Sequence, residues 1–160
     1  MDWLAWHAAY DDPSSPISGR LRRVRWHLAQ AIDQAPAGPV RLVSLCAGQG
    51  RDVLGILPAH PRRHDVRALL VEADARNAEL ARRAADEAGV PQVEVRLADA
   101  GVVANFADAL PADVLLLCGI FGNIAFEAPS INISIGVNRL RDAPSPGLSG
   151  HPLFTFREGG

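Results

Sequence analysis

The stretch LVSLCAGQGRDVLGIL, residues 42–57, decides the expected fold. Its apolar run ends at Cys46, and two glycines, Gly48 and Gly50, follow at once. Glycine lets the backbone approach a ligand closely, and the pattern from Gly50 onward predicts a short helix over residues 50–57 with unpaired N–H groups at its start. A strand, a glycine loop and a helix in this order indicate a ligand-binding turn in an α/β protein.

Apolar strands and helices alternate on both sides of this turn. The strands are expected at 40–46, 66–72, 93–97 and 113–121, and the helices at 17–35, 75–89 and 105–110. Nearly unbroken apolar strands alternating with helices predict an α/β fold, a three-layer sandwich with a mostly parallel, doubly wound sheet. For the helix over 75–89, Asp74 is the expected N-cap and Gly89 the expected C-cap.

The alternation ends after residue 121. Two further strands are predicted at 132–140 and 153–158, with a loop rich in proline and glycine between them. No helix separates these two strands, so we expect an antiparallel pair.

Composition narrows the function classes. The net charge is −2, and all 16 basic residues are arginine, which excludes lysine-based chemistry and argues against bulk nucleic-acid binding. The arginines between Arg20 and Arg25 leave a local contact with nucleic acid open. No apolar stretch approaches the roughly 20 residues of a membrane span, and the first residues do not resemble a secretory signal. We therefore expect a cytoplasmic protein without a membrane partner.

Two cysteines and two histidines are the candidates for reactive or metal-binding groups. Cys46 and Cys118 lie in apolar runs, which favours small buried side chains over a redox pair. His60 and His64 lie four residues apart in a loop broken by proline, and no third ligand accompanies them. We expect no metal site.

Two acidic residues suggest the kind of ligand. Glu72 ends the second strand, where its carboxylate can accept hydrogen bonds from both hydroxyls of a ribose. Asp99 follows the third strand, where it can accept from an adenine amino group. Dinucleotide sites usually have a third small residue where this chain has Val53. The pattern thus favours adenosine without a pyrophosphate.

Four segments of the sequence together resemble a known family. They lie within residues 40–124 and read VSLCAGQGRDVL, LLVEADARNAELARRAA, VEVRLADAG and DVLLLCGIFGNI. In order and spacing they resemble the first four motifs of class I S-adenosylmethionine-dependent methyltransferases. The resemblance implies S-adenosylmethionine as cofactor. The residues expected to bind it are Ala47, Gly48, Gly50, Glu72, Ala73, Asp99, Ala100 and Cys118.

The resemblance assigns these residues to parts of the cofactor. Gly48 and Gly50 would approach its methionine part, and Glu72 and Asp99 would bind the ribose and the adenine edge. Ala73 and Ala100 would flank the adenine ring, and Cys118 would end a strand close to the cofactor.

The chain also departs from the family's pattern. Many members have an acid at the position of Ser44, where it holds the cofactor's amino group through water, and glycine at the position of Cys46. Asp52 is interpreted as a charge favoured at the N-terminus of the expected helix.

No residue is an evident general base. His7, Tyr10 and Asn123 are candidates, each with a structural alternative: an aromatic cover over the core for His7 and Tyr10, and a cap or turn for Asn123. In this family an N-terminal segment often closes over the cofactor. We therefore expect an N-terminal lid and helix over 1–39 and a Rossmann-like cofactor-binding part over 40–160, within a single domain.

The resembled fold has seven strands in the order 3-2-1-4-5-7-6. Only about 36 residues follow Asn123, so strand five and its flanking helices are expected to be missing from a shortened C-terminal half. We expect the segment 153–158 to pair directly beside the strand over 113–121, since an open edge there would invite a homodimer.

The leading hypothesis is a methyltransferase that acts on an unidentified acceptor, most simply a small molecule. One alternative is a non-catalytic S-adenosylmethionine-binding or assembly protein of the same fold. A second is an NAD-dependent oxidoreductase, against which Val53 and Asp99 argue.

Overall fold

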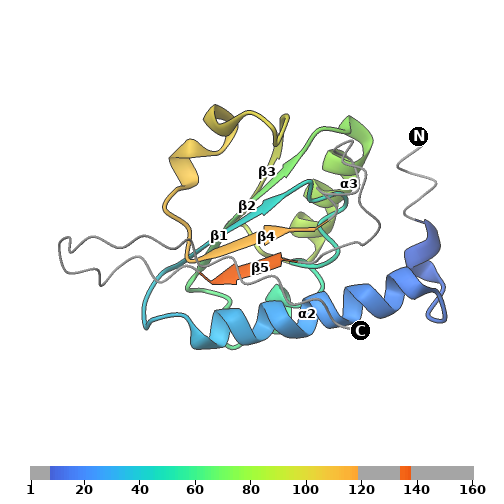
Figure 1. Ribbon diagram of the computed structural model, residues 1–160, viewed down its shortest axis with the longest axis horizontal. Helices are drawn as coiled ribbons and strands as arrows, with labels where there is room; N and C mark the ends of the chain where they lie inside the picture. Colours follow the sequence, from blue (N-terminus) through green and yellow to red (C-terminus); the bar gives the residue numbers. More distant parts are fainter. Residues whose placement is uncertain (1–7, 119–133, 138–160) are drawn as a thin grey trace, which may run out of the picture.

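The computed structural model describes residues 8–118 and 134–137 (Figure 1). The helices are the 3-10 helix η1 (Ala8–Asp11), the α-helices α2 (Pro16–Gln34) and α3 (Ala75–Glu87), and the short 3-10 helices η2 (Leu57–Ala59), η3 (Val103–Asn105) and η4 (Ala107–Ala109). The strands are β1 (Val40–Leu45), β2 (Val66–Glu72), β3 (Val93–Leu97), β4 (Val114–Leu117) and β5 (Ser134–Val137).

The strands form one sheet in the order β3-β2-β1-β4-β5. β3, β2, β1 and β4 run parallel, with Leu42 of β1 between Ala68 of β2 and Val114 of β4. This arrangement confirms the predicted parallel order 3-2-1-4. It places the carboxyl ends of β1, β2 and β4 side by side.

The strand beside β4 is not the expected one. β5, from the segment predicted over 132–140, pairs antiparallel with β4, and β1 occupies the opposite edge of β4. A strand has only two hydrogen-bonding edges, so the prediction that 153–158 lies directly beside β4 is wrong. Residues 153–158 themselves lie outside the described residues.

The two faces of the sheet are covered differently. On one face, Val24, Leu28 and Ile32 of α2 pack with alternate residues of the strands and with Ala85 of α3. These spacings of three and four residues are those of an amphipathic helix. On the other face, Phe106 packs against the sheet with small side chains from the segment that carries η3 and η4, drawn in gold in Figure 1.

Two short helices predicted from the sequence are not α-helices in the structure. Residues 51–56 form turns that lead into η2, and the helix expected over 105–110 is replaced by the two 3-10 turns η3 and η4. The first segment contains Gly55 and meets Pro58, which lacks a backbone N–H; both residues disfavour a continued α-helix.

The start of α3 follows the prediction, whereas its C-cap is Ala88 instead of the predicted Gly89. Asp74 Oδ1 accepts hydrogen bonds from the backbone N–H groups of Arg76 and Asn77 at 2.8 and 3.2 Å, as an N-cap does. Ala88 is the C-cap, and Gly89 follows it with φ at +63°, a left-handed conformation that glycine adopts without a Cβ penalty.

The end of α2 is held by an arginine from the loop before β2. Nη1 of Arg62 donates to the carbonyls of Ile32 and Ala35, both at 2.7 Å, and Nη2 donates to Pro36 and Gly38 at 2.7 and 3.1 Å. One guanidinium thus satisfies four carbonyls where the helix stops.

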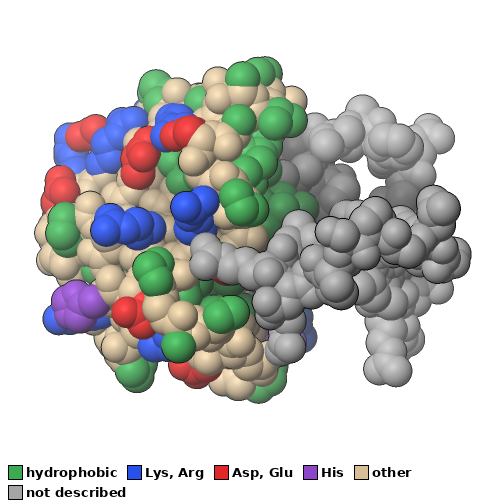
Figure 2. Space-filling view, turned by 90° about the vertical axis from the view of Figure 1, so that its left-hand side faces the viewer, with side chains coloured by type: hydrophobic (Ala, Val, Ile, Leu, Met, Phe, Trp, Pro, Cys, Tyr) green, Lys and Arg blue, Asp and Glu red, His purple; other side chains and the backbone are tan. Residues whose placement is uncertain are grey.

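The surface at the end of the molecule where β1 to β4 begin is of mixed charge. Figure 2 views this end and shows arginine and acidic side chains interspersed. Among the helices in the described part of the chain, none has the length and apolar character needed to cross a membrane.

Candidate functional site

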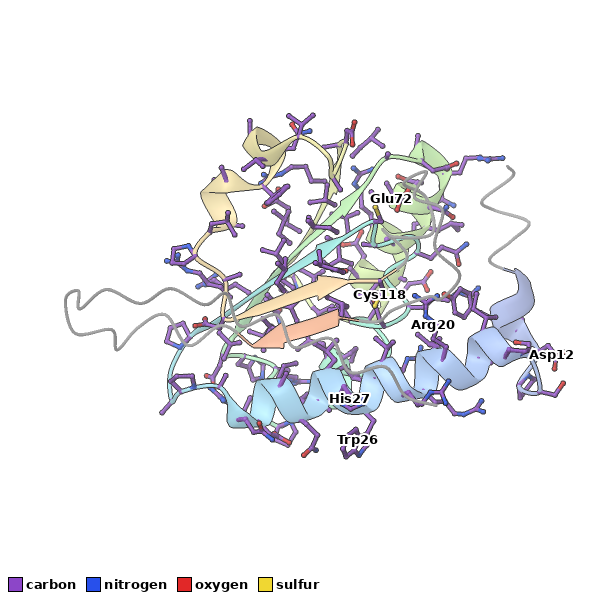
Figure 3. The ribbon with its side chains drawn as sticks, viewed as in Figure 1. Asp12, Arg20, Trp26, His27, Glu72 and Cys118 are labelled. Atoms are coloured by element: carbon purple, nitrogen blue, oxygen red, sulfur yellow. The ribbon has the colours of Figure 1, made fainter. Side chains whose placement is uncertain are left out.

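Backbone hydrogen bonds join neighbouring chain segments at the carboxyl ends of the parallel strands. The N–H of Ala47 donates to the carbonyl of Val71 at 3.0 Å, and the N–H of Ala98 donates to the carbonyl of Glu72 at 2.9 Å. The segments that leave β1, β2 and β3 therefore start side by side. Figure 3 shows Glu72 and Cys118 at this same end of the sheet.

The loop after β1 has an unusual backbone. Gly48 and Gly50 have φ values of +58° and +67°, and Cys46 has φ at +53°. The left-handed region is open to glycine but costs other residues about 1–2 kcal/mol. This conformation gives a physical reason for glycine at the position of Cys46, so the cysteine adds local strain to the loop.

The loop also packs tightly against the side chains of Leu70 and Leu54. A Cβ added to Gly50 would lie 2.7 Å from Cδ2 of Leu70 and 3.1 Å from Cδ1 of Leu54. Leu70 is fully buried in β2, so the backbone at Gly50 rests directly on the core. Glycine at this position is a requirement of both conformation and space.

The carboxylate of Glu72 lies against this loop. The N–H of Gly48 donates to Oε2 at 2.7 Å, and the N–H of Asp74 donates to Oε1 at 2.8 Å. Glu72 is half-buried, and each of its oxygens keeps a second lone pair. The side chain is therefore fixed in place while still able to accept further hydrogen bonds.

Asp99 lies near Glu72 at the end of β3. Leu97 is the register partner of Glu72, and Asp99 follows it by two residues. The Asp99 carboxylate is exposed, and Oδ1 accepts the N–H of Gly101 at 2.7 Å. Ala73 directly follows Glu72 and is exposed, and Ala100 directly follows Asp99 and is half-buried, so both lie at the same end of the sheet.

Both cysteines are free and half-buried at this end of the sheet. Burial, with the negative charges of Glu72 and Asp99, raises the pKa of the Cys46 thiol. Burial raises the pKa of the Cys118 thiol to about 12, and the charge of Asp52 acts in the same direction. Both thiols are thus held protonated, which disfavours thiolate chemistry.

The structure contradicts the interpretation of Asp52 as a charge at the N-terminus of a helix. No α-helix begins in residues 51–56, so Asp52 is not a charge at a helix N-terminus. It is 8% exposed, and Oδ1 accepts the N–H of Val53 at 2.8 Å. Burial raises its pKa, which the nearby charges of Arg25 and Arg20 partly oppose.

A polar network joins the N-terminal segment to the loop. Arg51 donates to Asp11 Oδ1 at 2.7 Å and to Gln49 Oε1 at 2.9 Å, and its guanidinium lies 5.5 Å from the ring centre of Tyr10. Gln49 Nε2 in turn donates to Asn77 Oδ1 of α3 at 3.2 Å. This network fixes the position of Tyr10 beside the loop.

Of the three candidate bases, only Tyr10 is within the described residues; His7 and Asn123 lie outside them. Burial raises the pKa of the Tyr10 phenol above its usual value of 10.0. Tyr10 therefore stays protonated near neutral pH, where it can donate a hydrogen bond but is a poor base.

The sequence did not identify Asp52, Arg51 or Arg20 as parts of this site. Arg51 and Asp52 directly follow the loop, and the helix breakers Gly55 and Pro58 were a signal that Asp52 would not begin a regular helix. Arg20 of α2 lowers the pKa of the Cys118 thiol at the end of β4, and an interaction between residues so far apart in the sequence leaves no periodic signal.

Comparison with known proteins rests on structures alone. No protein-family model matches the chain, and no curated protein sequence matches it. An RNA methyltransferase from Salinibacter ruber, solved with S-adenosylhomocysteine, is 29% identical over 66% of this chain and 60% of its own, with a TM-score of 0.46. The N-terminal domain of EvdMO1, solved with S-adenosylhomocysteine, is 26% identical over 62% of this chain and 38% of its own, with a TM-score of 0.49.

Whole EvdMO1 is 24% identical, with a TM-score of 0.52 over 66% of this chain and 23% of its own. This likeness agrees with the parallel order 3-2-1-4 and the glycine loop after β1. The chain therefore has a Rossmann-like α/β fold, which it shares with EvdMO1. It spans 60% or less of the length of these three solved chains, so a methyltransferase activity of this chain is a proposal.

Proposed function

We propose that the chain binds S-adenosylmethionine at the carboxyl ends of β1, β2 and β3 and transfers its methyl group to an acceptor, most simply a small molecule. The observation that carries this proposal is the Glu72 carboxylate, held by the N–H groups of Gly48 and Asp74. A fixed, half-buried acceptor with two free lone pairs suits the two adjacent hydroxyl donors of a ribose.

The surrounding residues support an adenosine ligand. Asp99 offers an exposed acceptor for the adenine amino group, and Ala73 and Ala100 leave room for a flat ring beside the backbone. Ala47, Gly48 and Gly50 would lie against the rest of the cofactor, with Cys118 at the end of the neighbouring strand β4.

The turns after the loop favour this ligand over a dinucleotide. A dinucleotide site places the pyrophosphate at the N-terminus of a helix, where aligned N–H groups favour negative charge. Residues 51–56 are turns, and the side chain of Val53 within them is buried in the core. An NAD-dependent oxidoreductase thus has less support in this loop than a nucleoside-binding protein.

A bound S-adenosylmethionine would supply an activated methyl group attached to a sulfonium. The chain's own task would then be to orient the cofactor and to exclude water, since the methyl donor needs no further activation. Tyr10, fixed by Arg51 at the loop, would serve as a hydrogen-bond donor rather than as a base.

The test separates a methyltransferase from a non-catalytic binding protein of the same fold. Purified chain is incubated with S-adenosylmethionine and pooled small-molecule acceptors, and the formation of S-adenosylhomocysteine is followed by mass spectrometry. Formation that requires both chain and acceptor pool supports transfer. Binding of S-adenosylmethionine by calorimetry without any product would support the non-catalytic alternative.

A further inference from the structure

The outer side of α2 carries arginines around an exposed tryptophan. Arg22, Arg23, Trp26 and His27 are all exposed, and spacings of three and four residues bring them to one side of the helix, here called the arginine–tryptophan face. Trp26 is 60% exposed, and Figure 3 shows it on the side of α2 that faces away from the sheet. The indole therefore contributes little to the core, and its large flat surface is open to a partner.

The positive charge of this face is not balanced within the helix. Residues 16–32 contain no aspartate or glutamate. Among the described residues, Arg23 has no partner in a hydrogen bond or ion pair, and the guanidinium of Arg22 donates to one neutral group, the carbonyl of Pro13, at 3.2 Å. Both guanidinium groups thus retain donors that can bind an anion.

The acids closest in sequence do not supply that anion. Asp11 accepts from Arg51 at 2.7 Å, and Asp12 Oδ1 accepts from the N–H and the hydroxyl of Ser14 at 2.9 and 2.7 Å. Asp33, the one acid in α2, lies at the C-terminal end of the helix. The arginine–tryptophan face is therefore complementary to an anionic partner from outside the chain.

The indole of this face has a defined orientation. The ring centres of Trp26 and His27 lie 4.7 Å apart with their planes at 79°, an edge-to-face arrangement. Such a contact restricts rotation of the indole while the ring stays exposed. A restricted ring loses less conformational entropy when a second flat group stacks on it.

The apolar side chains of α2 distinguish between two kinds of anionic partner. A helix that binds an anionic membrane inserts its apolar face, but in α2 that face, with Val24, Leu28 and Ile32, is buried in the core. Along α2, which the structure describes in full, Trp26 is the one exposed large apolar side chain. Single-stranded nucleic acid needs no more than this, since arginines bind its phosphates and an aromatic ring stacks on a base.

We propose that the arginine–tryptophan face binds single-stranded nucleic acid, with one base stacked on Trp26 and neighbouring phosphates bound by Arg22 and Arg23. Every base has a flat surface for stacking, so little sequence preference is expected. The net charge of −2 argues against attraction over the whole surface and restricts binding to this face. The inference does not rest on the proposed function, because binding at this face requires no S-adenosylmethionine.

The experiment separates stacking from charge. Binding of a fluorescein-labelled oligothymidylate of about 12 nucleotides is followed by fluorescence anisotropy at several salt concentrations, with protein up to about 100 μM. Trp26→Ala should weaken binding about 5- to 100-fold, the range that one base–aromatic stack provides, and leave the salt dependence unchanged. Arg23→Gln should reduce the slope of the logarithm of the binding constant against the logarithm of the salt concentration by about 0.7, as expected for one phosphate contact with a single strand.

The matched control is Arg83→Gln, which removes an exposed arginine on α3 that pairs with Glu79 at 2.9 Å and should change neither quantity. Circular dichroism melts check that each variant is folded, as expected for substitutions of exposed side chains. Undiminished binding by Trp26→Ala, or an equal loss in Arg83→Gln, would show general electrostatic attraction and overturn the inference.

Two further outcomes would also overturn it. The first is a folded parent chain that does not bind the oligonucleotide. The second is binding to vesicles of phosphatidylserine and phosphatidylcholine without binding to the oligonucleotide, which would indicate a membrane surface as the partner. Titration with S-adenosylhomocysteine is a separate measurement, so failure of the proposed function would leave this inference standing.

Discussion

Gly50 provides a quantitative test of the loop geometry. In Gly50→Ala the new Cβ would have to accept a φ of +67° and a contact of 2.7 Å with Leu70 Cδ2. The left-handed conformation costs a non-glycine residue about 1–2 kcal/mol. Overpacking of a well-packed core costs about 1–3 kcal/mol more, because Leu70 is fully buried and has little room to move. We therefore expect the free energy of unfolding to fall by about 2–5 kcal/mol.

Gly89→Ala isolates the conformational part of this cost. Gly89 has φ at +63°, close to that of Gly50, but nothing lies within 4 Å of its added Cβ. The expected loss is about 1–2 kcal/mol. Urea unfolding followed by far-ultraviolet circular dichroism gives both values, with equal m-values as the check that only stability has changed. If Gly50→Ala costs no more than Gly89→Ala, the close contact between the loop and Leu70 is refuted.

Three further predictions concern stability. Cys46→Gly should be neutral or stabilising by up to about 1 kcal/mol, since it relieves φ at +53°, whereas a loss above about 1 kcal/mol in urea would contradict the strain argument. Arg62→Ala should cost about 2–3 kcal/mol because four carbonyls at the end of α2 lose their donor, and Arg62→Lys should recover only part, as thermal unfolding can show. Because the pKa of Asp52 is raised in the folded chain, protonation of its carboxylate stabilises the folded state at low pH. This contribution to the free energy of unfolding is lost as the pH rises from about 4 through the folded pKa. Urea midpoints should therefore be similar for the parent chain and Asp52→Asn near pH 4 and favour Asp52→Asn at pH 7; a constant difference would exclude this titration.

The strands were predictable because each is a run of apolar, often β-branched residues between turn signals. The segments 66–72 and 93–97 were placed at their observed bounds, and the polar cap at Asp74 located the start of α3. The neighbouring positions of Glu72 and the glycine loop follow from parallel strands that end at one edge. Composition, periodicity and caps thus sufficed for the parallel strands, for α2 and for the start of α3.

Other parts depend on contacts that leave no local pattern. The segment 50–57 has helical spacing, but Gly55 and Pro58 interrupt it. The carbonyl of Arg51 accepts a hydrogen bond from Arg25 of α2, and Gln49, just before the segment, donates to Asn77 of α3. The choice between 132–140 and 153–158 as the strand beside β4 could not be made from β-propensity, since both segments alternate apolar residues. The sequence interpretation of Asp52 was wrong because residues 51–56 form turns instead of an α-helix, so no helix N-terminus is present to favour its charge.

The domain division at residue 39 and the roles of the individual site residues remain predictions. α2 contributes Val24, Leu28 and Ile32 to the same core as β1, so its removal would expose that face of the sheet. The binding roles of Glu72 and Asp99 rest on their position and hydrogen-bonding capacity.

The most direct test of the proposed site is calorimetric titration of the folded chain with S-adenosylhomocysteine, repeated with Glu72→Gln. The parent chain should bind, and the variant should bind at least about 10-fold more weakly while still unfolding cooperatively, because one carboxylate oxygen is replaced by an amide donor facing backbone N–H groups and ribose hydroxyls. Absence of binding by the folded parent chain, or equal affinity of the variant, would contradict an adenosine site built on Glu72.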